Sequence, residues 1–359
     1  MIFHQLPRYF FGVIALAFSS VSFAQSPTGL LLKNYKPQSV FKIPQTHIQK
    51  AKYPVIDMHS HDNSSSPQEI DEWVKVMDSA GIAKTIILSY TTGKSFDSIV
   101  AKYAAYPGRF DIFCGFDYTG YDKPGWPEHA VKELIRCHKM GAKGVGELGD
   151  KGLGLYYSKP SPAWGMHIDD PRMKPLLAKC AELKMPVSIH VADPIWMYEQ
   201  MDSTNDGLMN AYTWKIDLTQ KGILNHQELV QTLENAVQQN PKTTFIACHL
   251  ANCVYDLGIL GAMLDRFPNL YADIAARYEE TATIPRYIRA FYEKYQDRLV
   301  YGTDMGHEVT MYRETFRILE SADEHFYNDY NYHWPLYGLA LPADVLKKIY
   351  QENALKIIQ

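Results

Sequence analysis

Residues 55–61 read Val-Ile-Asp-Met-His-Ser-His, and this stretch decides the fold that we expect. It begins as a short apolar run of the kind that forms a buried strand, and it ends in polar side chains. On an extended strand, residues spaced by two project to the same face, so His59 and His61 form a chelating pair. A single His-x-His pair is a weak indication of metal binding, so the ends of the other strands decide whether it has partners.

Seven further apolar runs follow along the chain. They are residues 84–89, 110–115, 143–146, 186–189, 243–248, 269–274 and 298–301. Segments of helical period lie between them, at 67–80, 127–140, 171–184, 225–239, 254–267 and 283–295. Strand followed by helix, repeated eight times, predicts an α/β fold of the (β/α)₈ TIM-barrel type. A doubly wound open sheet is the structural alternative, but no Gly-rich phosphate-binding turn supports it.

Both ends of the chain contain segments that lie outside the eight strand–helix repeats. Residues 1–24 combine Arg8, an apolar run and small residues at Ser22 and Ala24, which is the pattern of a cleavable signal peptide. Residues 25–52 are polar and contain three prolines, so we expect an N-terminal arm lying on the surface of a barrel that spans 53–359. The segment 342–358 predicts one extra C-terminal helix on the outside. No other window is apolar enough to insert stably in a membrane after cleavage, so a periplasmic or secreted location follows.

Composition excludes several classes of protein. The chain has 359 residues, 46% of them hydrophobic, which is ample for a large core. Its 36 basic and 40 acidic residues give a net charge of −4, so nucleic acid is not an expected partner, and a metal-dependent nuclease is disfavoured. Five cysteines without a C-x-x-C pair predict buried thiols, since they form no even disulfide framework. A homo-oligomer remains compatible with the sequence.

Polar residues recur where the expected strands end. Besides His59 and His61, these residues are Glu147, His190, His249 and Asp304. In a TIM barrel the carboxyl ends of the strands meet at one face and build the active site there. A lone His or Asp at a strand end is usually structural, but six such residues at five of eight strand ends predict a metal centre.

In these stretches the chain resembles the amidohydrolase superfamily, and within it the amidohydrolase-related branch of metal-dependent hydrolases and nonoxidative decarboxylases. The resemblance extends over residues 53–358. It implies that His59, His61 and His190 are metal ligands, that His249 is a ligand or acts on the substrate, and that Asp304 binds metal or serves as base. Glu147 stands where some members carry a carboxylated lysine, so two alternatives stay open. Either one ion is held by His59, His61, His190 and Asp304, or two ions are bridged by Glu147 with His249 on the second.

Imidazole and carboxylate ligands favour a divalent metal, with Zn²⁺ preferred and Mn²⁺ admissible. Such an ion brings the pKa of a bound water towards neutrality. Asp304 would then accept a proton during attack on a carbonyl, and His249 would polarise that carbonyl. Five further residues are candidates for substrate binding because they follow strand ends or lie in a long loop. They are Arg277, Lys151, Tyr156, His307 and Trp196.

The function we expect is that of an exported hydrolase acting on a C–O or C–N bond of a small molecule. We expect its substrates to be esters, lactones or amides, including sugar-derived or carboxylated compounds. The same donor set also supports nonoxidative decarboxylation, in which the metal binds substrate oxygens. A catalytically inactive solute-binding barrel is the third alternative, and the complete ligand set argues against it.

Overall fold

The structure is a computed structural model that describes residues 27–156, 162–328 and 332–358. Its internal contacts divide the chain into two compact units, residues 1–35 and 36–359. The described part of the first unit contains two short 3₁₀ turns, η1 (Pro27–Gly29) and η2 (Leu32–Asn34). The predicted signal peptide lies outside the described residues and therefore stays a prediction.

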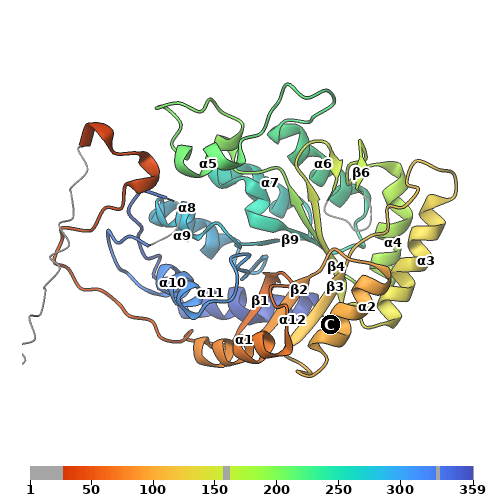
Figure 1. Ribbon diagram of the computed structural model, residues 1–359, viewed down its shortest axis with the longest axis horizontal. Coiled ribbons are helices and arrows are strands. Elements are labelled where there is room, and N and C mark those ends of the chain that lie inside the picture. Colours follow the sequence, from red (N-terminus) through yellow and green to blue (C-terminus); the bar gives the residue numbers. More distant parts are fainter. Residues whose placement is uncertain (1–26, 157–161, 329–331, 359) are drawn as a thin grey trace, which may run out of the picture. The chain divides into compact units, whose positions relative to one another are not determined.

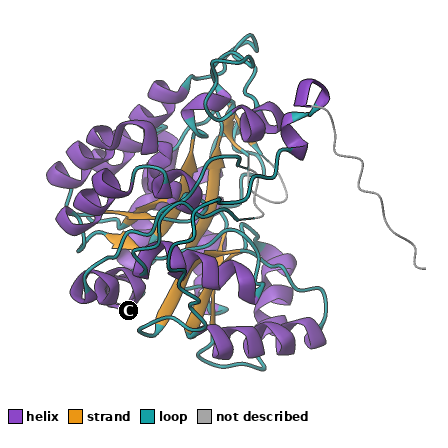
Figure 2. Ribbon diagram, turned by 90° about the vertical axis from the view of Figure 1, so that its left-hand side faces the viewer, coloured by secondary structure: helices purple, strands orange, loops and turns teal. Residues whose placement is uncertain are grey.

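Eight parallel strands form the centre of the second unit (Figures 1 and 2). In spatial order they are β1 (Val55–Ser60), β2 (Ile82–Leu88), β3 (Phe110–Cys114), β4 (Gly144–Asp150), β7 (Val187–Val191), β8 (Phe245–Ala247), β9 (Leu270–Asp273) and β10 (Leu299–Val300). The short strands β5 (Gly154–Leu155) and β6 (Ala163–Trp164) form an antiparallel extension of β4. This arrangement confirms the predicted (β/α)₈ barrel.

Backbone hydrogen bonds close the ring of strands between β1 and the segment that follows β10. The Met58 N–H donates to Tyr301 O at 2.9 Å, and the N–H groups of Thr303 and Asp304 donate to His59 O at 3.1 and 2.8 Å. The bond at Asp304 therefore fixes its backbone against that of His59, so the closure of the barrel also brings two predicted ligands together.

A helix follows each central strand, and the helices surround the sheet in Figure 2. They are α1 (Pro67–Ala80), α2 (Gly93–Tyr103), α3 (Trp126–Lys139), α4 (Lys174–Glu182), α6 (His226–Gln239), α7 (Leu257–Arg266), α9 (Pro285–Lys294) and α10 (Val309–Glu320). Local sequence sets several of their ends. The Ser66 side chain caps the start of α1, and Gly81, with φ +90°, follows its last residue as the C-cap. Asn225 and Glu228 form a capping box at the start of α6. No helix among these described residues is long and apolar enough to cross a membrane.

Shorter elements occupy the connections that follow the strands. They are η3 (Pro171–Met173), η4 (Ile195–Met197), α5 (Leu208–Trp214), η5 (Cys248–Asn252), η6 (Val254–Asp256) and α8 (Tyr278–Ala282). Connections at the carboxyl ends of the strands surround the mouth of a TIM barrel, so these elements supply walls for a site there.

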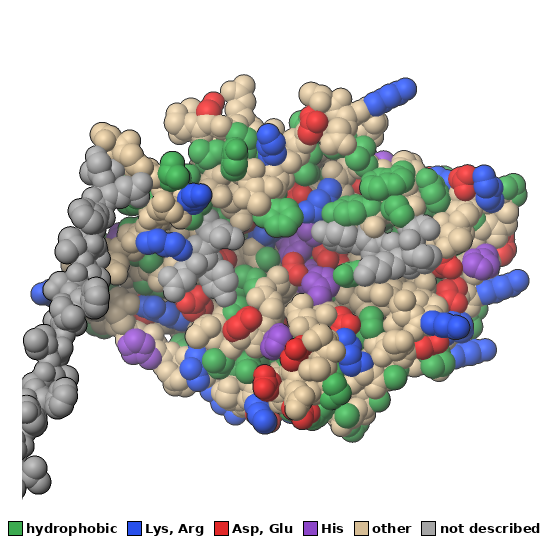
Figure 3. All heavy atoms as spheres, viewed as in Figure 1, with side chains coloured by type: hydrophobic (Ala, Val, Ile, Leu, Met, Phe, Trp, Pro, Cys, Tyr) green, Lys and Arg blue, Asp and Glu red, His purple; other side chains and the backbone are tan. Residues whose placement is uncertain are grey.

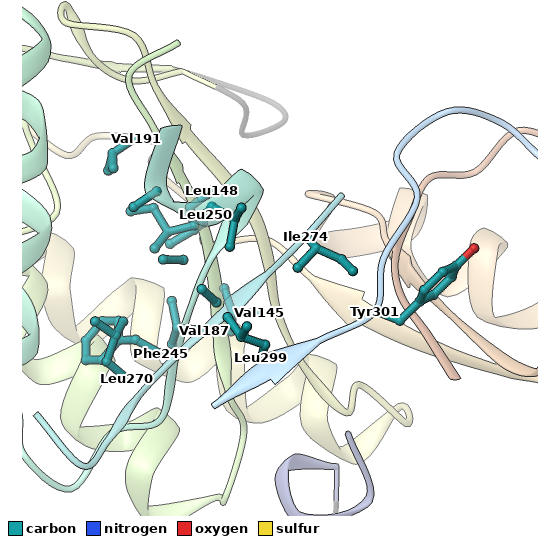
Figure 4. Close-up of a cluster of buried hydrophobic side chains, with 14 of the residues drawn as sticks. Val145, Leu148, Val187, Val191, Phe245, Leu250, Leu270, Ile274, Leu299 and Tyr301 are labelled. Carbon is teal, nitrogen blue, oxygen red and sulfur yellow. The ribbon is translucent and has the colours of Figure 1, made fainter. Parts of the chain in front are cut away.

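Two apolar clusters hold the barrel together. The larger cluster lies between the strands and the helices, and Figure 4 shows part of it, with side chains such as Val145, Val187 and Phe245 from neighbouring strands packed together. The smaller cluster fills the barrel interior with side chains that alternate with those of the larger one, such as Ile56 and Met58 after Val55. All five cysteines are free and buried, as predicted.

The C-terminal helix packs on the outside of the strands, and its last turn reaches one further cluster. It consists of α11 (Ala343–Lys347), the π-helical turn η7 (Lys348–Glu352) and α12 (Asn353–Ile357). Val345, Leu346, Ile349 and Tyr350 belong to the larger cluster, as expected for a helix packed on the outside of the strands. Ala354 and Ile357 additionally join the smaller cluster with Ile56 and Met58. The interior of the barrel offers apolar surface at the end away from the ligands, and α12 covers it.

The part of the arm that belongs to the second unit, residues 36–52, packs against α10 and the residues after it. The Thr46 N–H and hydroxyl donate to Asp323 at 2.8 and 2.6 Å. The Lys52 N–H donates to Glu320 at 3.0 Å, and Arg313 donates to the carbonyl of Gln49 at 3.1 Å. This part of the arm therefore binds to its own barrel.

Candidate metal centre

The six predicted ligands come together at the carboxyl ends of the strands. His59 and Glu147 lie in β1 and β4, His190 lies in β7, and the other three stand within the first four residues after β1, β8 and β10. Each of the six has a nitrogen or carboxylate oxygen within 4 Å of such an atom in at least one of the others. Figure 3 shows histidine and acidic side chains gathered near the middle of the face turned to the viewer.

Three of the histidines are held through Nδ1, which directs Nε2 towards the shared centre. His59 Nδ1 donates to Asp273 Oδ2 at 2.8 Å. His61 Nδ1 donates to Leu88 O, and His249 Nδ1 donates to Ala275 O, both at 2.9 Å. A histidine that donates through one nitrogen presents a lone pair on the other, which is how metal-binding histidines are oriented.

The distances between the donor atoms suit a common metal ion. His61 Nε2 lies 3.0 Å from Asp304 Oδ1 and 3.4 Å from Glu147 Oε2. His249 Nε2 lies 3.4 Å from Glu147 Oε1 and 3.6 Å from Asp304 Oδ2. Two ligands bound at about 2.1 Å to one tetrahedral or octahedral ion are roughly 3.0–3.5 Å apart.

Two buried imidazole nitrogens also indicate a missing partner. The Nε2 atoms of His59 and His249 are buried, and neither makes a hydrogen bond to any residue that the structure describes. Buried polar atoms normally have a partner, and an unprotonated imidazole nitrogen facing carboxylates is suited to a cation. The residues present therefore fit the divalent metal that the sequence predicts.

Glu147 lies between two groups of potential ligands. Its Oε2 faces His61, whereas its Oε1 lies 2.9 Å from His190 Nδ1 and 3.4 Å from His249 Nε2. Glu147 is accordingly shared by the group with His59 and His61 and by the group with His190 and His249. Its Oε1 also lies 3.7 Å from His59 Nε2, so one carboxylate contacts members of both groups, as a bridging ligand would.

The electrostatic field at this centre favours positive charge. Burial alone would lower the pKa of His59, but the carboxylate of Asp273, with Asp304 and Glu147, raises that pKa well above its usual value. Burial also opposes the pKa rise of His61, whose contacts with Asp304 and Glu147 bring it to about 10. Buried carboxylates that stabilise cationic imidazoles stabilise a bound metal cation by the same attraction.

The pKa values of Asp304 and His249 are lowered, in contrast to those of His59 and His61. Burial would raise the pKa of Asp304, but His59, His61 and His249 lower it to about 2. Burial lowers the pKa of His249 itself, and the neighbouring charges of His190 and His59 lower it further. At neutral pH the centre therefore offers an ionised carboxylate and a neutral imidazole, the protonation states that a metal ligand requires.

An unusual backbone segment positions His249. From His249 to Asn252, four successive residues have φ between 54° and 58°, in the left-handed region that non-glycine residues avoid. Each such residue costs about 1 kcal/mol or more, and strain of this kind is found at functional sites. The same turn places Asn252 Oδ1 where it accepts from Arg277 Nε and Nη2, at 3.1 and 2.5 Å.

A cavity of about 580 Å³ lies over the donor atoms. His61, Glu147, His190, His249 and Asp304 line it on one side. The rest of its lining includes Lys151, Asp193, Trp214, Arg277, Glu279 and Tyr332. Its volume is that of a small-molecule site.

The structure brings two of the five predicted substrate-binding residues, Lys151 and Arg277, to the cavity, but not the other three. Tyr156 stacks on Trp164, with ring centroids 6.3 Å apart. The other two rings pack within the fold: Trp196 fits so closely against Gly207 that a Cβ there would lie 2.4 Å from its ring, and His307 stacks on Trp73 at 4.7 Å.

Several residues of this site were not predicted from the sequence. Asp273 and Asp193 carry a signal that could have identified them, because both stand at or just after a strand end. Glu279 lies two residues after Arg277, but the sequence does not reveal that a short helix, α8, begins between them. Tyr332 follows β10 at a long distance in the sequence, and no periodicity there predicts that it reaches the cavity.

Comparisons with known proteins bear on the fold and the family of the chain. A search of curated proteins finds no match. The fold is similar to that of 2,6-dihydroxybenzoate decarboxylase from Rhizobium, with a TM-score of 0.53, 16% identity, and 85% of this chain and 98% of that chain covered. It is also similar to 5-carboxyvanillate decarboxylase from Novosphingobium aromaticivorans, solved with manganese, with a TM-score of 0.52, 14% identity, and coverage of 88% and 99%.

A third solved structure with this fold is an uncharacterized TIM-barrel protein from Bordetella bronchiseptica. Its TM-score is 0.55 at 17% identity, and the match covers 85% of this chain and 98% of that chain. Identities at this level show a shared fold. The amidohydrolase family model matches residues 47–358, which is most of the sequence. The chain therefore belongs to the amidohydrolase family.

Proposed function

We propose that the protein is a metal-dependent hydrolase that cleaves a C–O or C–N bond of an ester, lactone or amide in a small molecule. The observation that carries this proposal is the position of Glu147, with one carboxylate oxygen towards His61 and the other towards His190 and His249. This arrangement fits two ions bridged by Glu147, one bound by His59 and His61 and the other by His190 and His249. Paired ions of this kind are typical of hydrolytic sites.

Divalent metal ions bound here would supply Lewis-acid polarisation of the substrate and lower the pKa of water. Nitrogen and oxygen donors without a thiolate suit Zn²⁺, which remains the preferred ion, and also Mn²⁺. The manganese in the 5-carboxyvanillate decarboxylase structure gives further support to Mn²⁺ as an alternative.

Asp304 is the residue that we assign as the base. Its low pKa keeps it ionised at neutral pH, and its side chain is 26% exposed on the lining of the cavity. A carboxylate in this position accepts a proton from the attacking water and passes it to the leaving group. His249, neutral and fixed through Nδ1 by Ala275, presents the lone pair of Nε2 to the same space, where it would serve as a ligand of the second ion.

The export of the protein remains part of this proposal and rests on the sequence of residues 1–24. An exported enzyme meets nutrient esters, lactones, amides and sugar derivatives, which are the substrate classes proposed for the cavity. Fractionation of the native cell, with the protein located by antibody, tests this placement. Finding the full-length chain with its first residues in the cytoplasm would contradict it.

Nonoxidative decarboxylation is the second candidate. It is favoured by the shared fold with two decarboxylases, of 2,6-dihydroxybenzoate and of 5-carboxyvanillate. The same donor set can support both reactions, so the products must separate them. The metal-loaded protein should be incubated with a panel of esters, lactones and amides at constant pH, and with hydroxylated benzoates in a sealed CO₂ assay. Formation of a free carboxylic acid or of its amine or alcohol product from the first panel supports the hydrolase, whereas CO₂ release from the second alone contradicts it.

A further inference from the structure

One wall of the cavity carries a charged pair beside an exposed aromatic ring. Lys151 Nζ lies 3.0 Å from Asp193 Oδ1, and the same ammonium lies 5.6 Å from the centroid of Trp214. All three side chains line the cavity. They come from the segment after β4, the segment after β7, and the end of α5, so three separate connections converge on this wall.

Asp193 has an acceptor that the protein does not use. Its side chain is only 5% exposed, and its Oδ1 faces Lys151 and His190. Its Oδ2 is buried and makes no hydrogen bond to any part of the chain that the structure describes. A buried carboxylate oxygen normally has a donor partner, so a bound molecule with a suitable donor would supply it.

The charges of this wall select the kind of group that would bind. A carboxylate would be attracted by Lys151 but would face the unused oxygen of Asp193, and an ammonium would have the opposite conflict. Since the two side chains neutralise each other, a neutral group is favoured. A hydroxyl both donates and accepts, so it can donate to Asp193 Oδ2 and accept from Lys151 Nζ.

Trp214 adds a flat apolar surface to these polar groups. Its side chain is 57% exposed although the residue lines the cavity, so burial in the core of the protein does not explain its presence. Aromatic rings in binding sites contribute a rigid surface on which a ring can stack. A ring with C–H groups on its faces and hydroxyls at its edge matches both the tryptophan and the Asp193–Lys151 pair.

We propose that Asp193, Lys151 and Trp214 form a subsite for the hydroxylated ring of a sugar-type substrate. This inference rests on the proposed function, because it names the substrate class of the same cavity. The bond to be cleaved would then lie near Asp304 and the metal ligands, with the ring held against Asp193, Lys151 and Trp214. Sugar lactones and acylated sugars are the compounds that combine these two features.

Binding of uncleaved probes tests the subsite separately from catalysis. The probes are methyl glycosides of several neutral hexoses and pentoses, with cyclohexylamine and cyclohexanecarboxylate as charged rings without hydroxyls. Saturation-transfer NMR on the full metal-loaded chain should detect binding of at least one glycoside and weaker binding of both charged rings. Trp214→Ala should weaken glycoside binding by about threefold to tenfold, the usual range for an aromatic stacking contact. Lys151→Met should weaken it as well.

Tyr212→Ala is the matched control, because Tyr212 lies in the same helix and is exposed but does not line the cavity. It should leave binding unchanged. Metal content and circular dichroism of every variant check that the site and the fold are intact. The test depends on Trp214 and Lys151, which are not proposed metal ligands.

Two results would overturn the subsite. One is that no glycoside binds, and the other is that glycosides bind equally well to wild type, Trp214→Ala and Lys151→Met. Failure of the proposed function looks different. If glycosides bind in a Trp214-dependent manner but the loaded protein hydrolyses no ester, lactone or amide of a sugar, the subsite stands and the hydrolase proposal falls. If other esters are hydrolysed while no glycoside binds, the hydrolase proposal stands and the subsite falls.

Discussion

His59 and Asp273 are joined by a 2.8 Å hydrogen bond between two fully buried side chains, one on β1 and the other at the end of β9. The carboxylate of Asp273 also accepts from the backbone N–H groups of His249 and Ala275, at 2.8 and 3.1 Å. One aspartate thus fixes the ring of one proposed ligand and the backbone of another. Its role is to hold the donors in position before any ion binds.

Replacing Asp273 by Asn should weaken metal binding by about 10-fold to 100-fold, the usual effect of losing a carboxylate partner of a ligand histidine. An amide NH₂ facing Nδ1 would favour the tautomer of His59 that carries its proton on Nε2, the atom needed for the metal. Titration of the apoprotein with Zn²⁺ measures the change. Asp111→Asn, which removes a strand carboxylate paired with Lys84, is the control and should bind as wild type does. Equal affinity of both variants would contradict the assigned role.

Asp304→Asn should reduce turnover by roughly 10²-fold to 10⁴-fold, because an amide cannot accept the proton of the attacking water. Its free energy of unfolding should change far less, since the Asp304 N–H bond to His59 O belongs to the backbone and is retained. Steady-state kinetics and chemical denaturation of the same preparation give both numbers. Turnover close to wild type would remove Asp304 as the base.

Attachment of residues 36–52 to the barrel should depend on pH through Asp323. Burial alone would raise the pKa of Asp323, but hydrogen bonds from Thr46 and the charge of Arg317 lower it. A folded-state pKa below the unfolded value of about 3.9 means that this stabilisation is present above that value and is lost as pH falls through the folded pKa. Hydrogen exchange of the Thr46 amide should therefore show protection at neutral pH that declines in acid.

Asp323→Asn provides the comparison for that experiment, because it keeps the shape of the side chain and removes its charge. The Thr46 amide of this variant should be less protected at pH 7 and should lose the acid dependence. If wild type and variant exchange alike across the acidic range, the carboxylate does not hold the arm.

The barrel and its ligands could be predicted from the sequence because both follow from one regularity. Strand ends converge at one face, so residues such as His59 and His190 are brought together by any correct assignment of the strands. The contact of α12 with the smaller cluster could not be predicted, since Ala354 and Ile357 form an apolar face that would equally suit the larger one. The packing of His307 could not be predicted either. His307 is close to Asp304 in the sequence, but its ring stacks on Trp73.

The lining of the cavity was harder to predict for a physical reason. Loop conformations depend on contacts with other loops, and no periodic pattern records these contacts. Trp196 and Trp214 stand in the same long connection, yet one packs beneath Gly207 and the other lines the cavity. Aromatic content alone does not distinguish the two positions.

If Glu147 bridges two metal ions, the metal content per chain should reveal it. Purified wild type reconstituted with Zn²⁺ should hold close to two ions by elemental analysis, and Glu147→Gln should hold close to one while remaining folded. Glu279→Gln, which changes another acid of the cavity lining, should still hold two. One ion in wild type, with no loss in Glu147→Gln, would contradict the bridging role, and no metal after reconstitution would contradict the hydrolase proposal itself.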